Sequence, residues 1–101
     1  MRSEDDEIGE LYETAARARY QFIRVELQTC LTALEMADFE LSIGNSAVAE
    51  REVACAEKGI GTARRFLPEV SAEQRTELEA KLAELHAILD AVKARLSALS
   101  R

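Results

Sequence analysis

The chain has 101 residues, of which 48% are hydrophobic and 32% are charged, so it is long enough for one domain with one core. Glycine and proline together number only five, which favours a globular helical fold over disorder. A formal net charge of −6 argues against a nucleic-acid partner, since phosphate binding draws on clustered Lys and Arg.

The sequence also predicts that the protein does not insert into a membrane. No apolar run approaches the roughly 20 residues needed to span a bilayer, and the acidic residues 3–7 are unlike a signal peptide. Cys30 and Cys55 lie outside any CxxC pattern, so we expect small buried thiols in a reducing compartment. Together these features predict a cytoplasmic protein.

A first long helix is predicted over residues 4–43. Ser3 is a suitable N-cap, and the four acids after it suit the positive end of the helix dipole. Small or apolar residues then follow at alternating spacings of four and three, which is typical of a helix that packs along its length. These residues are Ala16, Tyr20, Ile23, Leu27, Cys30, Leu34, Ala37 and Leu41.

A tight turn at Gly44-Asn45-Ser46 separates this helix from a second one, predicted over residues 46–66. If the two helices are antiparallel, residue numbers that face each other add up to about 90. In this register each large side chain of one seam faces a small side chain of the other, as Leu34 faces Ala56, which would fill the space between the helices without voids. The second seam consists of Ala49, Val53, Ala56, Ile60, Ala63 and Leu67.

Gly59 and Gly61 flank the seam residue Ile60, and each is expected to weaken the helix by about 0.5 to 1 kcal/mol relative to alanine. A tolerated local weakening is the preferred interpretation. The alternative is a close approach of another helix, or a hinge.

A third helix is predicted over residues 72–98, because Pro68 ends the second helix and Ser71 with Gln74 matches a capping box. A fold back near residue 69 makes facing numbers on the last two helices add up to about 138. Its seam consists of Leu78, Leu82, Leu85, Leu89, Val92, Leu96 and Leu99. The predicted fold is all-α, a single domain over residues 1–101 built as an up-down-up three-helix antiparallel bundle.

This register leaves residues 4–22 overhanging the bundle, and it places the end of the third helix beyond the second. An apolar helical arm is marginal in water, so we expect a partner surface, most simply in a two-fold homodimer. The alternative is that the first helix begins near Ala15 and residues 1–15 are frayed. The predicted interface consists of Ile8, Leu11, Tyr12, Ala15, Tyr20, Phe22, Val92, Leu96 and Leu99.

No catalytic, metal or cofactor site is predicted. His86 is the only histidine and lacks a second ligand or a nucleophile at a useful spacing, so a surface or boundary position is expected for it. The stretch from Cys55 to Gly59 is similar to a histidine phosphotransfer motif, but Cys55 stands in the place of the histidine. We therefore predict that the protein is not an enzyme.

Residues 30–61 resemble one tetratricopeptide hairpin, or the matching part of a microtubule-interacting and trafficking domain. Glu40 and Gly61 depart from the pattern, and no second repeat follows. The resemblance implies protein binding and assigns no binding residue. It is carried by Ala37, Gly44, Asn45, Ala49, Val53 and Ala56.

The predicted function is a non-enzymatic interaction or scaffolding module that self-associates. One alternative is an adaptor that binds an amphipathic helix of another protein. A second alternative is a small-ligand-binding bundle, which the Leu- and Ala-filled seams disfavour.

Overall fold

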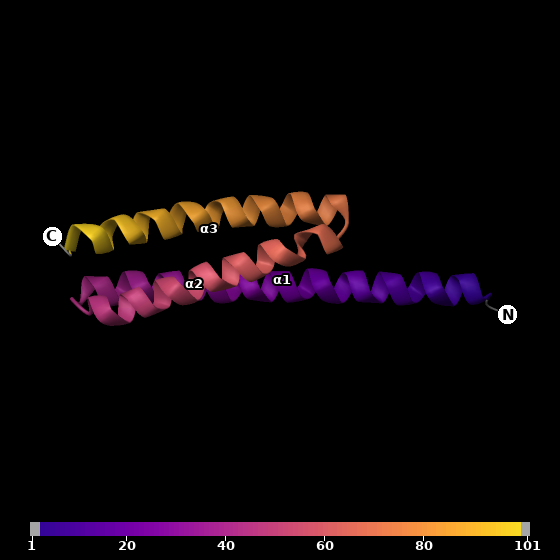
Figure 1. Cartoon of the computed structure of the whole chain (residues 1–101), viewed down its shortest axis with the longest axis horizontal. Coiled ribbons are helices and arrows are strands. Elements are labelled where there is room, and N and C mark those ends of the chain that lie inside the picture. The colour runs from indigo at the N-terminus through magenta and orange to yellow at the C-terminus, as the bar shows by residue number, and fades with distance from the viewer. Residues whose placement is uncertain (1–2, 100–101) are drawn as a thin grey trace.

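The computed structural model describes residues 3–99 and shows three helices joined by two short connections. They are α1 (Glu4–Ser42), α2 (Ser46–Phe66), the 3-10 turn η1 (Leu67–Glu69) and α3 (Ala72–Leu99). In Figure 1, α1 and α3 run in one direction and α2 in the other. The predicted three-helix bundle is therefore confirmed, with helix boundaries within one residue of those expected.

The start of α1 is fixed by the predicted serine cap. The Asp6 backbone N–H donates to the Ser3 hydroxyl at 3.3 Å, and the Asp6 carboxylate accepts from the Ser3 backbone N–H at 3.5 Å. This reciprocal capping box satisfies two backbone donors that a helix end leaves open. The prediction that the first helix begins here is confirmed, and the alternative start near Ala15 is wrong because α1 is continuous from Glu4.

The first connection turns at Gly44, whose φ of +81° lies in the left-handed region that favours glycine. The two helices then pack in the predicted register. The Cys30 Sγ donates to the carbonyl of Ala56, and the Phe22 and Phe66 rings meet edge to face at 5.5 Å between centroids. These pairs add up to 86 and 88, close to the expected value of about 90 for an antiparallel hairpin.

The second connection covers the predicted residues 67–71, but the chain does not reverse at residue 69 as the sequence suggested. The chain continues past Phe66 as η1 before α3 begins at Ala72, behind a capping box between Ser71 and Gln74. The Arg75 guanidinium donates to the carbonyls of Leu67, Pro68 and Val70, which ties η1 to α3.

Because the chain reverses only after η1, α3 is shifted along the bundle. Tyr20 donates a hydrogen bond to Glu77 at 2.5 Å, and Asp38 pairs with Arg95, and both pairs are separated by 57 residues. The first residue of α3 therefore lies level with Ala15, not with residue 24 as predicted. The predicted position of α3 along α1 is wrong by about nine residues, or about 13.5 Å at 1.5 Å per residue.

The shift changes which part of α1 is uncovered. Every residue from 4 to 14 is exposed, and burial begins at Ala15 and Ala16. We call residues 4–14 the arm; it extends about 16 Å beyond the bundle at 1.5 Å per residue and makes the molecule 68 Å long (Figure 1). The predicted overhang is confirmed, but it is shorter than the expected 4–22.

One continuous core runs between the three helices. Its largest fully buried side chains are Ile23, Leu34, Leu78 and Cys30, and no buried polar or charged residue occurs among residues 3–99. The predicted seams supply nearly all of this core. Leu34 and Ala56 are both fully inaccessible, as the large-against-small packing requires.

The preferred interpretation of Gly59 is wrong, because this glycine marks a close approach of α1 to α2. A Cβ added to Gly59 would collide with the Cys30 Sγ and lie 3.3 Å from Glu26 Oε2. Gly61 is exposed, and a Cβ there would meet nothing within 4 Å. Only the first of the two glycines is required by packing.

Candidate interaction surface

The structure divides the predicted interface residues into three groups. Val92 and Leu96 are 3% and 9% exposed, so their assignment to an interface is wrong. Because α3 lies closer to the amino-terminal end of α1 than expected, these side chains remain level with the bundle and pack into the core of the chain itself. Leu99, one turn later, is 61% exposed.

Around the junction of arm and bundle the predicted residues are partly covered. Ala15 and Tyr20 are half-buried, and Tyr20 packs against the core. Phe22 remains 44% exposed although one edge contacts Phe66. The arm residues are open: Ile8, Leu11 and Tyr12 are 50%, 70% and 75% exposed.

Beyond these, α1 carries exposed apolar residues that the sequence interpretation missed: Val25, Met36, Phe39 and Ile43 at its end. They continue a second series with alternating spacings of three and four along the whole helix. We call this series the second face of α1. It consists of Ile8, Leu11, Ala15, Ala18, Phe22, Val25, Thr29, Thr32, Met36, Phe39 and Ile43.

The second face lies on the far side of α1 from the bundle. At 3.6 residues per turn, its centre is about 150° around the helix from the seam that carries Ile23 and Leu27. None of its eleven positions is charged. Ten of the eleven are exposed and Ala15 is half-buried, so the bundle leaves this face uncovered.

The two threonines of the second face do not oppose its burial against a partner. The Thr29 hydroxyl donates to the Val25 carbonyl at 2.9 Å, and the Thr32 hydroxyl donates to the Gln28 carbonyl at 3.1 Å. Because both hydroxyl protons already have acceptors within the helix, covering this face leaves no donor unpaired. The face is therefore suited to helix packing along its whole length.

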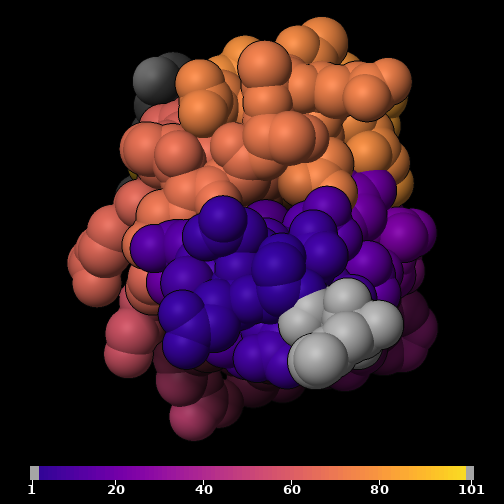
Figure 2. All heavy atoms as spheres, turned by 90° about the vertical axis from the view of Figure 1, so that its right-hand side faces the viewer, coloured from indigo at the N-terminus to yellow at the C-terminus, as the bar shows by residue number. Residues whose placement is uncertain are grey.

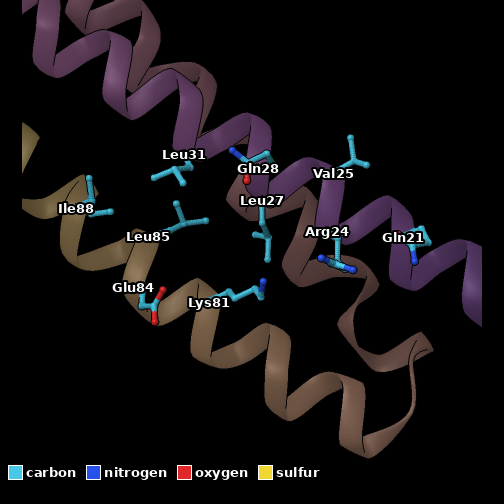
Figure 3. Close-up of a pocket in the computed structure, with 10 residues that line it drawn as sticks. All are labelled: Gln21, Arg24, Val25, Leu27, Gln28, Leu31, Lys81, Glu84, Leu85 and Ile88. Atoms are coloured by element: carbon cyan, nitrogen blue, oxygen red, sulfur yellow. The ribbon is translucent and has the colours of Figure 1, made fainter.

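A groove of about 400 Å³ lies beside this face, between α1 and α3 (Figure 3). Its wall is apolar, with Leu27, Leu31 and Leu85 pointing into the space between the helices. Arg24 from α1 and Lys81 from α3 extend toward one another at one end of it. The lining is completed by Gln21, Val25, Gln28, Glu84 and Ile88. Such a groove can accept an apolar side chain next to an acidic group.

Polar contacts fasten the junction between the arm and the bundle. Tyr20 donates to Glu77 on α3, and the Arg24 guanidinium lies 5.7 Å from the Tyr20 ring centroid. Arg19 pairs with Glu69 at 3.4 Å. The hydrogen bond to Glu77, with smaller effects of burial and of the Glu77 charge, raises the pKa of the Tyr20 hydroxyl. The phenol therefore stays protonated and continues to donate at neutral pH.

The residues considered for chemistry are not brought together. Cys30 is buried, but Cys55 is exposed, so the expectation that both thiols are buried is wrong for Cys55. Burial, with a smaller effect from Glu26, raises the pKa of the Cys30 thiol. His86 is half-buried, at the boundary position expected for it, and its Nε2 has no hydrogen-bond partner in the described part of the chain.

Residues 3–99 contain neither a metal-ligand cluster nor a membrane-spanning helix. No three His, Cys, Asp or Glu side chains of this range are grouped as metal ligands. No helix formed by these residues has the length and apolar character needed to cross a bilayer.

Comparisons with protein-family models, curated proteins and solved structures gave no match. The resemblance of residues 30–61 to a tetratricopeptide hairpin thus stays a prediction.

Proposed function

We propose that the protein is a non-enzymatic helical scaffolding module that self-associates through α1. The observation that supports this most is the second face, in which seven large apolar residues are 44% to 70% exposed and no charge interrupts them. Exposed apolar patches of this extent on small proteins mark interaction sites. The arm adds to the argument, because an isolated helical segment of this length is marginal in water.

A cytoplasmic location is part of the same proposal. It is supported by two cysteines that remain free thiols, one of them exposed to solvent. Exposed free thiols are typical of reducing compartments.

The test is a substitution in the middle of the second face. Val25→Glu removes little packing from the single chain, because Val25 is 63% exposed, but it places two carboxylates in the contact of a two-fold dimer. We expect the dimer dissociation constant to rise at least about 100-fold, because burying unpaired charges costs several kcal/mol. Light scattering at fixed concentration measures the mass.

Ala94→Glu is the matched control, because it adds the same charge at an exposed position on α3. The native chain and this control should both give a mass of about 22 kDa, twice the 11.2 kDa of one chain. Val25→Glu should give 11.2 kDa. A native chain that remains at 11.2 kDa up to high micromolar concentration would refute self-association.

The second candidate function is an adaptor for an amphipathic helix of another protein. The groove favours it, since Arg24 and Lys81 beside an apolar wall would suit a helix that carries acidic residues next to its apolar face. A monomeric native chain in the mass measurement would favour this candidate over the scaffold.

A further inference from the structure

We propose that the second copy lies antiparallel along the whole of α1, with facing residue numbers that add up to 47. This inference depends on the proposed self-association and specifies its geometry. In this register the centre of the contact is the pair of Phe22 and Val25, each of which meets the other on the partner chain.

The direction follows from the charge distribution on α1. Residues 4–13 carry six acids and no basic residue. A parallel pair would bring twelve carboxylates together at one end. An antiparallel pair separates the two acidic segments by tens of ångströms, well beyond the screening length of about 8 to 10 Å at physiological salt. Charge therefore favours the antiparallel pair, in which each acidic segment lies beside three acids of the partner copy, Glu35, Asp38 and Glu40, instead of six.

The extent follows from the area that a stable dimer needs. A helix face about 60 Å long and about 10 Å wide offers about 600 Å² on each chain, or about 1,200 Å² in total. This reaches only the lower end of the range of about 1,200 to 2,000 Å² for specific interfaces. Contact between the arms alone, at about 16 Å of length, would bury far less. A stable contact thus requires overlap of the whole helix.

The register follows from matching the apolar positions over that full length. Numbers that add up to 47 place Ile8 against Phe39 and Leu11 against Met36 of the partner copy, so the large apolar residues of the arm and of the opposite end cover each other. Sums of 54, 40 or 33 also align the spacing pattern. They shorten the overlap by one or two heptads, however: a sum of 54 leaves Ile8 without an apolar partner, and sums of 40 and 33 leave Phe39 without one.

The flanking residues support the same register. Arg19 would lie near Glu26 of the second copy, and the pair formed by Gln21 and Gln28 is neutral. One like-charge pair, Asp5 with Glu40, falls at each end of the contact. Exposed pairs contribute at most about 1 kcal/mol in either direction. The apolar overlap therefore decides the register.

Figure 2 shows that α3 does not cover the end of α1. Viewed from the amino-terminal end, the indigo side chains of the arm stand in front of the bundle, with the orange start of α3 on one side of them. The second face is about 150° away from the bundle seam, so a second copy can lie along α1 without meeting α2 or α3 of the first.

Distances between spin labels on the two copies test this geometry. Thr14 and Glu35 are exposed on the same side of α1, so Thr14→Cys and Glu35→Cys can each carry one label per chain. Both variants also carry Cys55→Ser, which removes the exposed native thiol. The chain with Cys55→Ser alone, without an introduced cysteine, serves as the labelling control. The 2% exposed Cys30 should remain unlabelled.

The proposed register gives long and similar separations along the helix axis. They are about 28 Å for the Thr14 label and about 34 Å for the Glu35 label, at 1.5 Å per residue. Short and equal distances would show a parallel pair, and a Glu35 distance far longer than the Thr14 distance would show a shorter overlap; either result refutes the register. The mass of the same samples is measured in parallel. A monomeric mass refutes the proposed function, whereas a dimeric mass with the wrong distances refutes only this inference.

Discussion

Gly59→Ala is expected to destabilise the folded chain by about 1 to 3 kcal/mol, the usual cost of overpacking a filled core. The added methyl group would collide with the Cys30 Sγ, which is itself held against the Ala56 carbonyl. Within a helix the cysteine side chain has few other rotamers to adopt. Urea denaturation at fixed protein concentration measures the change, so that any stabilisation by assembly stays constant.

Gly61→Ala is the matched control, because it makes the same substitution two residues later. A methyl group there meets nothing within 4 Å, so the helix should gain about 0.5 to 1 kcal/mol from the better propensity of alanine. In a Cys30→Ala background the penalty at Gly59 should largely disappear, because the colliding atom is gone. Equal effects at both glycines, or an undiminished penalty without the sulfur, would contradict the close approach.

The two cysteines are expected to differ in reactivity by at least about a thousand-fold, since an opening that costs about 4 kcal/mol reduces the accessible fraction by that factor. Cys55 is exposed on α2, whereas Cys30 is 2% exposed in the core. Burial also raises the pKa of the Cys30 thiol, so less of the reactive thiolate forms at a given pH. A thiol reagent should therefore modify one group promptly and the second only on unfolding.

The raised pKa of Cys30 also makes the stability of the folded chain depend on pH. Between the pKa of an unfolded cysteine and the raised pKa of Cys30, the unfolded chain loses a proton that the folded chain keeps, so stability falls as pH rises through this window. Raising the pH toward 9 should leave Cys30 of the folded chain protected from the thiol reagent. In the Cys55→Ser chain only Cys30 can react with a thiol reagent. A prompt reaction of this chain would contradict the burial of Cys30.

The first helical hairpin could be predicted from the sequence, but the position of α3 could not. Gly44 fixes one turn, and the register of α1 and α2 follows from it. The reversal was predicted near residue 69, but the chain forms η1 before it reverses. The later reversal moves α3 by about nine residues along α1, which buries Val92 and Leu96 and shortens the arm.

The second face was visible in the sequence and was missed because α1 carries two apolar series with the same spacing. The buried series accounts for the bundle, so Val25, Met36 and Phe39 read as scattered surface residues until their exposure is known. The roles of the two glycines also depend on register. Gly59 lies three residues after Ala56 and shares its face, whereas Gly61 points to solvent.

The proposed assembly requires that a second copy of the chain covers the arm and the second face of α1. Hydrogen exchange of the backbone amides in residues 4–14, followed over a dilution series, measures this coverage. These amides lie outside the bundle, so only assembly can protect them beyond the level of a fraying helix. We expect slow exchange at high concentration and fast exchange below the dissociation constant, while the amides around Leu34 stay protected throughout. Exchange of the arm at the same fast rate at every concentration would contradict the claim.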